Sequence, residues 1–105
     1  AHPSLNMIDS AIEMVRACPE DVRVAATAAL LDHDVSDRLD RIAVPSIVIG
    51  GTRDQMVRPH QVRALADGIT GATLEMLEGA GHMLIWERHE RVAELLVNLL
   101  DTPAA

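Results

Sequence analysis

The amino-acid sequence predicts an α/β fold in which a parallel sheet is covered by helices. Two observations support this prediction. From residue 43 onward the pattern reads as strand, helix, strand and helix, and connections of this kind join parallel strands. The first of these strands is a run of β-branched residues that does not alternate with polar ones, which is typical of a strand covered on both faces.

Helices are expected before this strand. Apolar residues at helical spacing predict a helix over residues 4–17. Pro19, followed by two carboxylates, begins a second helix that runs to about Leu31. One stripe of this second helix is apolar: Val22, Ala25, Ala26, Ala29 and Leu30. A short helix is expected over residues 37–41, so we divide the chain into a helical segment, residues 1–36, and an α/β part, residues 37–105.

The expected elements of the α/β part are a strand over residues 43–50, a helix from Pro59 to about Gly68, a strand over residues 72–77 and a last helix over residues 87–100. Ser46 then lies within a strand. Glu87 and Arg91 are one helical turn apart, which predicts an ordinary exposed ion pair.

Two strands are too few for a stable open parallel sheet. A strand as apolar as Ile47-Val48-Ile49 would also leave an unpaired edge. We therefore expect the chain to be the C-terminal part of a larger protein, whose missing N-terminal strands pair against residues 44–49. A lone copy would associate through the same edge, so a homo-oligomer is an alternative.

Composition excludes several classes of protein. The formal net charge of −7 argues against a nucleic-acid partner. No apolar run approaches the roughly 20 residues of a membrane span. The lone cysteine, Cys18, cannot form an internal disulfide, and we expect a cytoplasmic protein. The chain begins at Ala1 rather than methionine, which leaves the targeting signal open. His33 lies between two aspartates, but we interpret this segment as a solvated turn and expect no metal or cofactor.

Two polar residues follow the two predicted strands. Asp54 comes after the apolar run that ends at Gly50-Gly51, and His82 comes after the run that ends at Gly79-Ala80-Gly81. In open α/β sheets, ligands bind at the carboxyl ends of the strands, so both residues fall where a site is expected. An aspartate that holds a histidine ring forms an acid–base pair able to move a proton.

At these residues the sequence resembles the α/β-hydrolases. The acid loop of that family reads G-x-x-D, often with a later proline, and here it is Gly51-Thr52-Arg53-Asp54 followed by Pro59. The histidine follows a glycine and precedes an apolar stretch and a glutamate, here Gly81-His82 to Glu87. The resemblance implies that Asp54 is the triad acid and His82 the general base. It also implies that the α/β part is the C-terminal βαβα portion of a hydrolase sheet, and that residues 1–36 are the end of a cap.

The nucleophile of that family is absent from this sequence, which contains no G-x-S-x-G motif. We therefore expect the fragment alone to be inactive, and its parent to be a serine-type hydrolase of ester, thioester or related bonds. Met56, Val57 and Met83 border the two loops and could line a pocket for a small apolar ester-like substrate. An epoxide hydrolase, a dehalogenase, a cofactor-free haloperoxidase and a non-catalytic ligand-binding relative stay open as alternatives, as does a module that completes another chain's sheet.

Overall fold

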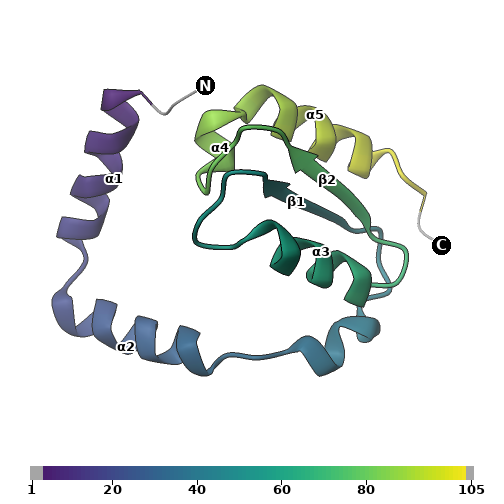
Figure 1. Cartoon of the computed structure of the whole chain (residues 1–105), viewed down its shortest axis with the longest axis horizontal. Coiled ribbons are helices and arrows are strands. Elements are labelled where there is room, and N and C mark those ends of the chain that lie inside the picture. The colour runs from purple at the N-terminus through teal and green to yellow at the C-terminus, as the bar shows by residue number, and fades with distance from the viewer. Residues whose placement is uncertain (1–3, 104–105) are drawn as a thin grey trace. The chain divides into compact units, whose positions relative to one another are not determined.

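The structure is a computed structural model of the 105-residue chain, and it describes residues 4–103 (Figure 1). The described residues form two compact units, residues 4–35 and residues 36–103, which we describe separately.

The first unit contains two helices, α1 (Leu5–Ala17) and α2 (Glu20–Asp32). The Ser4 side chain accepts a hydrogen bond from the backbone N–H of Met7 and so caps α1. Both helices agree with the prediction from the sequence. Neither contains a buried residue, so the apolar stripe predicted on α2 lies exposed in this structure.

The second unit carries the sheet. Its elements are the 3₁₀ helix η1 (Ser36–Arg41), β1 (Ile47–Gly51), α3 (Pro59–Gly68), β2 (Thr73–Leu77), α4 (Leu84–Glu87) and α5 (His89–Leu100). β1 and β2 pair in parallel, from Ile47 opposite Thr73 to Gly51 opposite Leu77. This confirms the predicted parallel sheet and the predicted order of strands and helices.

Helices α3 and α5 lie on opposite sides of the two strands (Figure 1). On the α3 side, Val48 packs in a buried cluster with Val62, Ala66 and Ile69. Side chains alternate between faces along a strand, so Glu75, opposite Ile49, points to the other side. There it bonds to Arg91 of α5 at 2.7 Å. The strands are therefore covered on both faces, as expected from their composition.

Helix α3 approaches β1 closely at Gly50. A Cβ at this position would lie 2.7 Å from the Cγ1 of Val62 and 3.1 Å from the Sδ of Met76. The absence of a side chain thus allows the helix to pack directly on the strand and keeps the strand end in a fixed position.

The structure corrects three boundaries. The first strand begins at Ile47 rather than residue 43, because Pro45 cannot donate to a ladder and the Ser46 hydroxyl bonds locally to the Val44 carbonyl at 2.8 Å. Ser46 therefore precedes β1 instead of lying within it. The strand also extends to Gly51, which we expected in the loop, and the second strand starts at Thr73, one residue late.

The last helix also differs from the prediction. It begins at His89 and is preceded by the single turn of α4, because the backbone of Arg88, at φ −139° and ψ 41°, leaves the helical conformation and interrupts the helix. The prediction of an ion pair between Glu87 and Arg91 is wrong. Arg91 bonds instead to Glu75 and to Glu94 at 2.9 Å, and Glu87 bonds to the backbone of Gly81.

Candidate active site

The candidate site lies where the two parallel strands end. β1 ends at Gly51 and β2 at Leu77, directly opposite each other. The backbone pairing continues past both ends. Thr52 N–H donates to the Leu77 carbonyl at 3.1 Å, and Arg53 N–H donates to the Ala80 carbonyl at 2.9 Å. The two loops therefore leave the sheet side by side.

Gly51 allows the second loop to cross close to the end of β1. A Cβ on Gly51 would lie 2.3 Å from the carbonyl oxygen of Ala80 and 2.6 Å from that of Gly81. Such distances are far below van der Waals contact, so any side chain here would push the histidine loop away.

Asp54 is the one buried charged residue among those described, with 6% of its surface exposed. Its Oδ1 accepts hydrogen bonds from the backbone N–H groups of Met56 at 2.8 Å and Val57 at 2.9 Å. Its Oδ2 lies 2.9 Å from Nδ1 of His82. One oxygen thus fixes the carboxylate to its own loop, while the other reaches across 28 residues of sequence to the second loop.

The surroundings of Asp54 favour its ionised form. Burial is the largest single influence and opposes ionisation, but hydrogen bonds from Val57 N–H, the His82 ring and Met56 N–H together outweigh it. The pKa of the Asp54 carboxyl therefore lies below its ordinary value. Near neutral pH this carboxylate is charged and acts only as an acceptor.

An ionised Asp54 determines which nitrogen of His82 carries the proton. Because the carboxylate can only accept, Nδ1 of His82 must donate, and in the neutral ring Nε2 then has the free electron pair. The side chain of His82 is 41% exposed, and the Asp54 contact is its only hydrogen bond within residues 4–103. Nε2 thus has a free electron pair and no hydrogen-bond partner within the described residues, so it can act as a base.

The histidine loop is tied down by two residues whose roles the sequence did not reveal. Glu87 Oε1 accepts a hydrogen bond from the backbone N–H of Gly81 at 3.0 Å. The Arg88 guanidinium donates to the carbonyls of Glu87 at 3.1 Å and Glu78 at 3.3 Å. The bonds to Gly81 and Glu78 thus link the loop, at two points before His82, to α4 and to the residue that follows it.

The predicted pocket residues border the site and are exposed. Met56 is 73% exposed, Val57 42% and Met83 41%. Met56 and Val57 stay next to the acid because their N–H groups bond to it. Met83 directly follows His82 and precedes α4. Their contact with a substrate stays a prediction.

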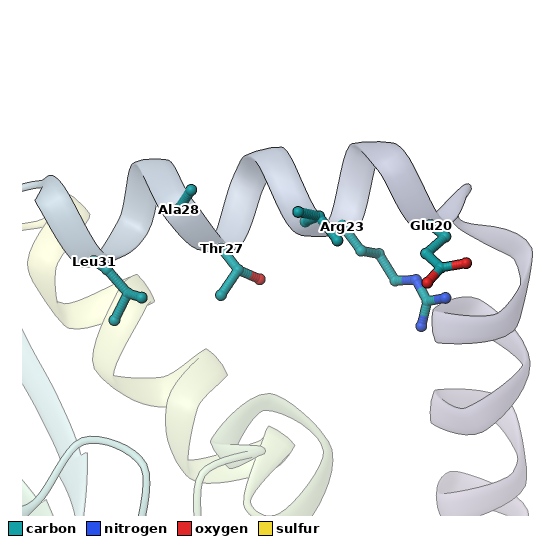
Figure 2. Close-up of a pocket in the computed structure, with 6 residues that line it drawn as sticks. Glu20, Arg23, Thr27, Ala28 and Leu31 are labelled. Carbon is teal, nitrogen blue, oxygen red and sulfur yellow. The ribbon is translucent and has the colours of Figure 1, made fainter.

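A hollow that the sequence did not predict lies along α2 (Figure 2). It is lined by Glu20, Arg23, Val24, Thr27, Ala28 and Leu31. All six residues belong to the same helix, so the hollow is an open groove on a helix face, and none of them is a predicted site residue.

The structure also bears on metals and membranes. In the described part of the chain, no three His, Cys, Asp or Glu side chains converge on a point where a metal could bind. His33 is exposed after α2. Within residues 4–103, no helix is both long and apolar enough to cross a membrane.

Comparison with known families supports the fold. A model of the alpha/beta hydrolase family matches residues 8–95. The chain belongs to this family. The match includes both strands, the two loops and most of α1 to α5, so the resemblance noted at Asp54 and His82 extends over most of the sequence.

Named alpha/beta hydrolases are similar to this chain. The monoacylglycerol lipase ABHD6 of Rattus norvegicus is 34% identical over 68 residues, which are 65% of this chain and 20% of that protein. The proline iminopeptidase of Lactobacillus helveticus is 32% identical over 72 residues, 69% of this chain and 24% of that protein. The crystal structure of an enol-lactonase from Burkholderia xenovorans LB400 superposes with a TM-score of 0.62 at 35% identity, over 66% of this chain and 26% of that one. The chain thus spans about a fifth to a quarter of the length of these alpha/beta hydrolases.

Proposed function

We propose that this chain supplies the acid and the general base of a serine-type hydrolase that acts on ester, thioester or related bonds. The observation that carries the proposal is the 2.9 Å contact between the buried Asp54 carboxylate and Nδ1 of the exposed His82 ring. In a G-x-S-x-G hydrolase the chain order is nucleophile, acid and histidine. Asp54 and His82 follow the last two steps of this order.

In this reaction Nε2 of His82 takes the proton of the serine hydroxyl as its oxygen attacks the carbonyl carbon of the substrate. The ring becomes a cation, which the ionised Asp54 stabilises across the Nδ1 hydrogen bond. His82 then returns the proton to the leaving oxygen or sulfur as the acyl bond breaks. In the second half, His82 removes a proton from water, and the resulting attack releases the acid and restores the serine.

The nucleophile lies outside this sequence in the proposed reaction. The four serines are Ser4, Ser10, Ser36 and Ser46, and none has the flanking glycines of a nucleophile elbow. Within the described residues, β1 pairs only with β2, so one edge of β1 can take further strands of a longer chain. We therefore expect no turnover from the 105 residues alone. The cytoplasmic location and self-association through the same edge stay predictions.

An ester is the substrate class best supported. Lipases and lactonases cleave carboxylic esters, and proteins with these names are similar to the chain at 34% and 35% identity. Three exposed apolar side chains lie beside the Asp54–His82 pair, which we call the dyad. They are Met56, Val57 and Met83, and they suit an acyl or alkyl group. No cofactor takes part in this mechanism.

The test uses the complete protein that contains this chain. His82→Ala should lower hydrolysis of a p-nitrophenyl ester by about 10³-fold or more, while the thermal unfolding temperature changes little, because the ring is partly exposed. His60→Ala, which alters an exposed histidine at the start of α3, is the matched control and should retain full activity.

Two outcomes would direct the assignment elsewhere. Unchanged turnover in His82→Ala would remove His82 from the mechanism and favour a ligand-binding relative without catalysis. Loss of turnover in His82→Ala, combined with resistance to a serine-reactive phosphonate, would indicate an aspartate nucleophile. Epoxides and alkyl halides would then be the substrates to try, since those reactions use a carboxylate nucleophile.

A further inference from the structure

The Thr52 side chain joins the acid loop to the histidine loop. Its Oγ1 accepts a hydrogen bond from the backbone N–H of Gly79 at 2.7 Å. Thr52 directly follows β1, and Gly79 is the second residue after β2. Within residues 4–103, this is the one hydrogen bond between a side chain of the first loop and the backbone of the second.

The bond holds the second loop where that loop changes direction. Gly79 has φ +75°, in the left-handed region, and the turn is closed by a bond from Ala80 N–H to the Leu77 carbonyl at 3.2 Å. The backbone N–H of Thr52 donates to the same Leu77 carbonyl at 3.1 Å. Thr52 therefore holds this turn at two points, by its backbone at Leu77 and by its hydroxyl at Gly79.

The hydrogen bond between Gly79 and Thr52 lies close in sequence to both residues of the dyad. Thr52 lies two residues before Asp54, and Gly79 lies three residues before His82. Asp54 is fixed within its own loop by bonds to Met56 and Val57. The distance between its Oδ2 and the ring of His82 thus depends on how the second loop is held against the first, and Thr52 contributes to that hold.

We propose that Thr52 is a positioning residue, whose hydroxyl fixes the His82 loop so that the imidazole meets Asp54 and aims Nε2 at the nucleophile. This inference rests on the proposed function of the dyad. Displacement of a catalytic group by about 1 Å can cost about 10²-fold in rate, so a loosened turn should slow the chemical step. In this proposal Thr52 acts through the loop and not on the substrate, so its loss should leave KM nearly unchanged.

Thr73 provides a matched control in the same pair of strands. Its hydroxyl donates to the carbonyl of Ser46 at 3.3 Å, at the opposite end of the strand pair from the dyad. Both threonines join the two strand segments across 27 residues of sequence. Thr73→Val therefore removes a comparable tie without touching the candidate site, and any effect common to both variants is one of stability.

The experiment measures ester hydrolysis by the complete protein with Thr52→Val, Thr52→Ser and Thr73→Val. We expect Thr52→Val to lower kcat by about 10-fold to 100-fold with KM within about twofold. Thr52→Ser keeps the hydroxyl and should restore most of the rate. Thr73→Val should keep the kcat of the unsubstituted protein. Equal kcat in Thr52→Val and Thr73→Val, or no rescue by serine, would overturn the proposal.

A second measurement uses the unsubstituted protein and so does not depend on whether a variant folds. Hydrogen exchange of the Gly79 amide in the unsubstituted protein should be slow, since that N–H is bonded to Thr52. Exchange as fast as that of exposed loop amides would show that the tie is absent and would overturn the proposal. The His82→Ala variant separates the two levels of inference. If it loses activity while Thr52→Val keeps full kcat, the dyad stands and the role of Thr52 fails; if it keeps activity, both fail.

Discussion

Replacing Asp54 by asparagine tests the dyad without creating a cavity. The aspartate uses Oδ1 to accept from two backbone N–H groups and Oδ2 to accept from His82. An asparagine has only one oxygen. Because Met56 and Val57 both present N–H donors, the oxygen should remain with them, and the amide NH₂ should then face His82.

This arrangement would reverse the hydrogen bond at the ring. The NH₂ group donates, so Nδ1 of His82 must accept, and the ring proton moves to Nε2. A protonated Nε2 cannot remove a proton from the nucleophile. The same aspartate-to-asparagine change in the triad of a serine protease costs about 10⁴-fold in kcat, and we expect a loss of about 10³–10⁴-fold here.

The cost in stability should be much smaller than the cost in rate. Hydrogen bonds to a charged acceptor contribute about 1.5–3 kcal/mol, against about 0.5–1.5 kcal/mol for neutral ones. The three bonds of Asp54 persist in altered form, so the free energy of unfolding should fall by about 1–3 kcal/mol.

The assay is hydrolysis of a p-nitrophenyl ester by the complete protein, together with urea unfolding. Asp67→Asn makes the same chemical change at an exposed site on α3 and should alter neither quantity. If Asp54→Asn lowered stability as expected and yet kept kcat within about threefold, Asp54 would be a turn carboxylate, and the inferred tautomer of His82 would be wrong.

Three further predictions concern the same loops. Glu87→Ala removes the acceptor of the Gly81 N–H and should lower kcat, while Glu87→Gln keeps an oxygen and should retain most of it; equal losses would show that charge rather than the bond matters. Gly51→Ala forces a Cβ against the Ala80 carbonyl and should destabilise the fold by about 1–3 kcal/mol in urea titration, whereas an unchanged midpoint would mean that the loop yields freely. The depressed pKa of Asp54 gives stability that is present above the unfolded-state pKa of about 3.9 and is lost as pH falls through the folded-state value, so acid unfolding followed by circular dichroism should be shallower in Asp54→Asn. Identical acid profiles in the two proteins would contradict that depression.

The sequence predicted the order of elements, the parallel sheet and the meeting of Asp54 with His82. These features follow from local rules. An unalternated β-branched run such as Ile47-Val48-Ile49 predicts a strand covered on both faces, and parallel strands end at the same edge of a sheet. Once both strands are placed, the residues that follow them are brought together without further information.

The side-chain partners could not be predicted in the same way. Arg91 is one helical turn from Glu87 in sequence, but it bonds to Glu75, which the sheet places beneath α5. The hydrogen bond from Gly79 to Thr52 depends on the register of strands and on a left-handed glycine. These contacts join residues that are 16 or 27 positions apart in the sequence. The periodicity within either segment does not predict them.

The predicted start of the first strand, at residue 43, is wrong for a related reason. Residues 43–46 lead directly into the β-branched residues of β1, but the Pro45 nitrogen carries no hydrogen and the Ser46 hydroxyl bonds back to the Val44 carbonyl. Pairing with the second strand begins only at the Ser46 carbonyl, which accepts from Thr73 N–H at 3.0 Å. Local hydrogen bonding of a serine competes with the sheet, and propensity alone does not show which prevails.

The two edges of the sheet differ in chemistry, which indicates where the sheet can grow. β2 carries a charge, Glu75, which is tied to Arg91, and charged residues are a common protection of edge strands. β1 carries only apolar residues and glycine from Ile47 to Gly51. A further parallel strand beside β1 would end next to Gly51, on the same rim as Asp54 and His82. A nucleophile on the loop after such a strand would therefore lie at the same rim of the sheet as the His82 ring.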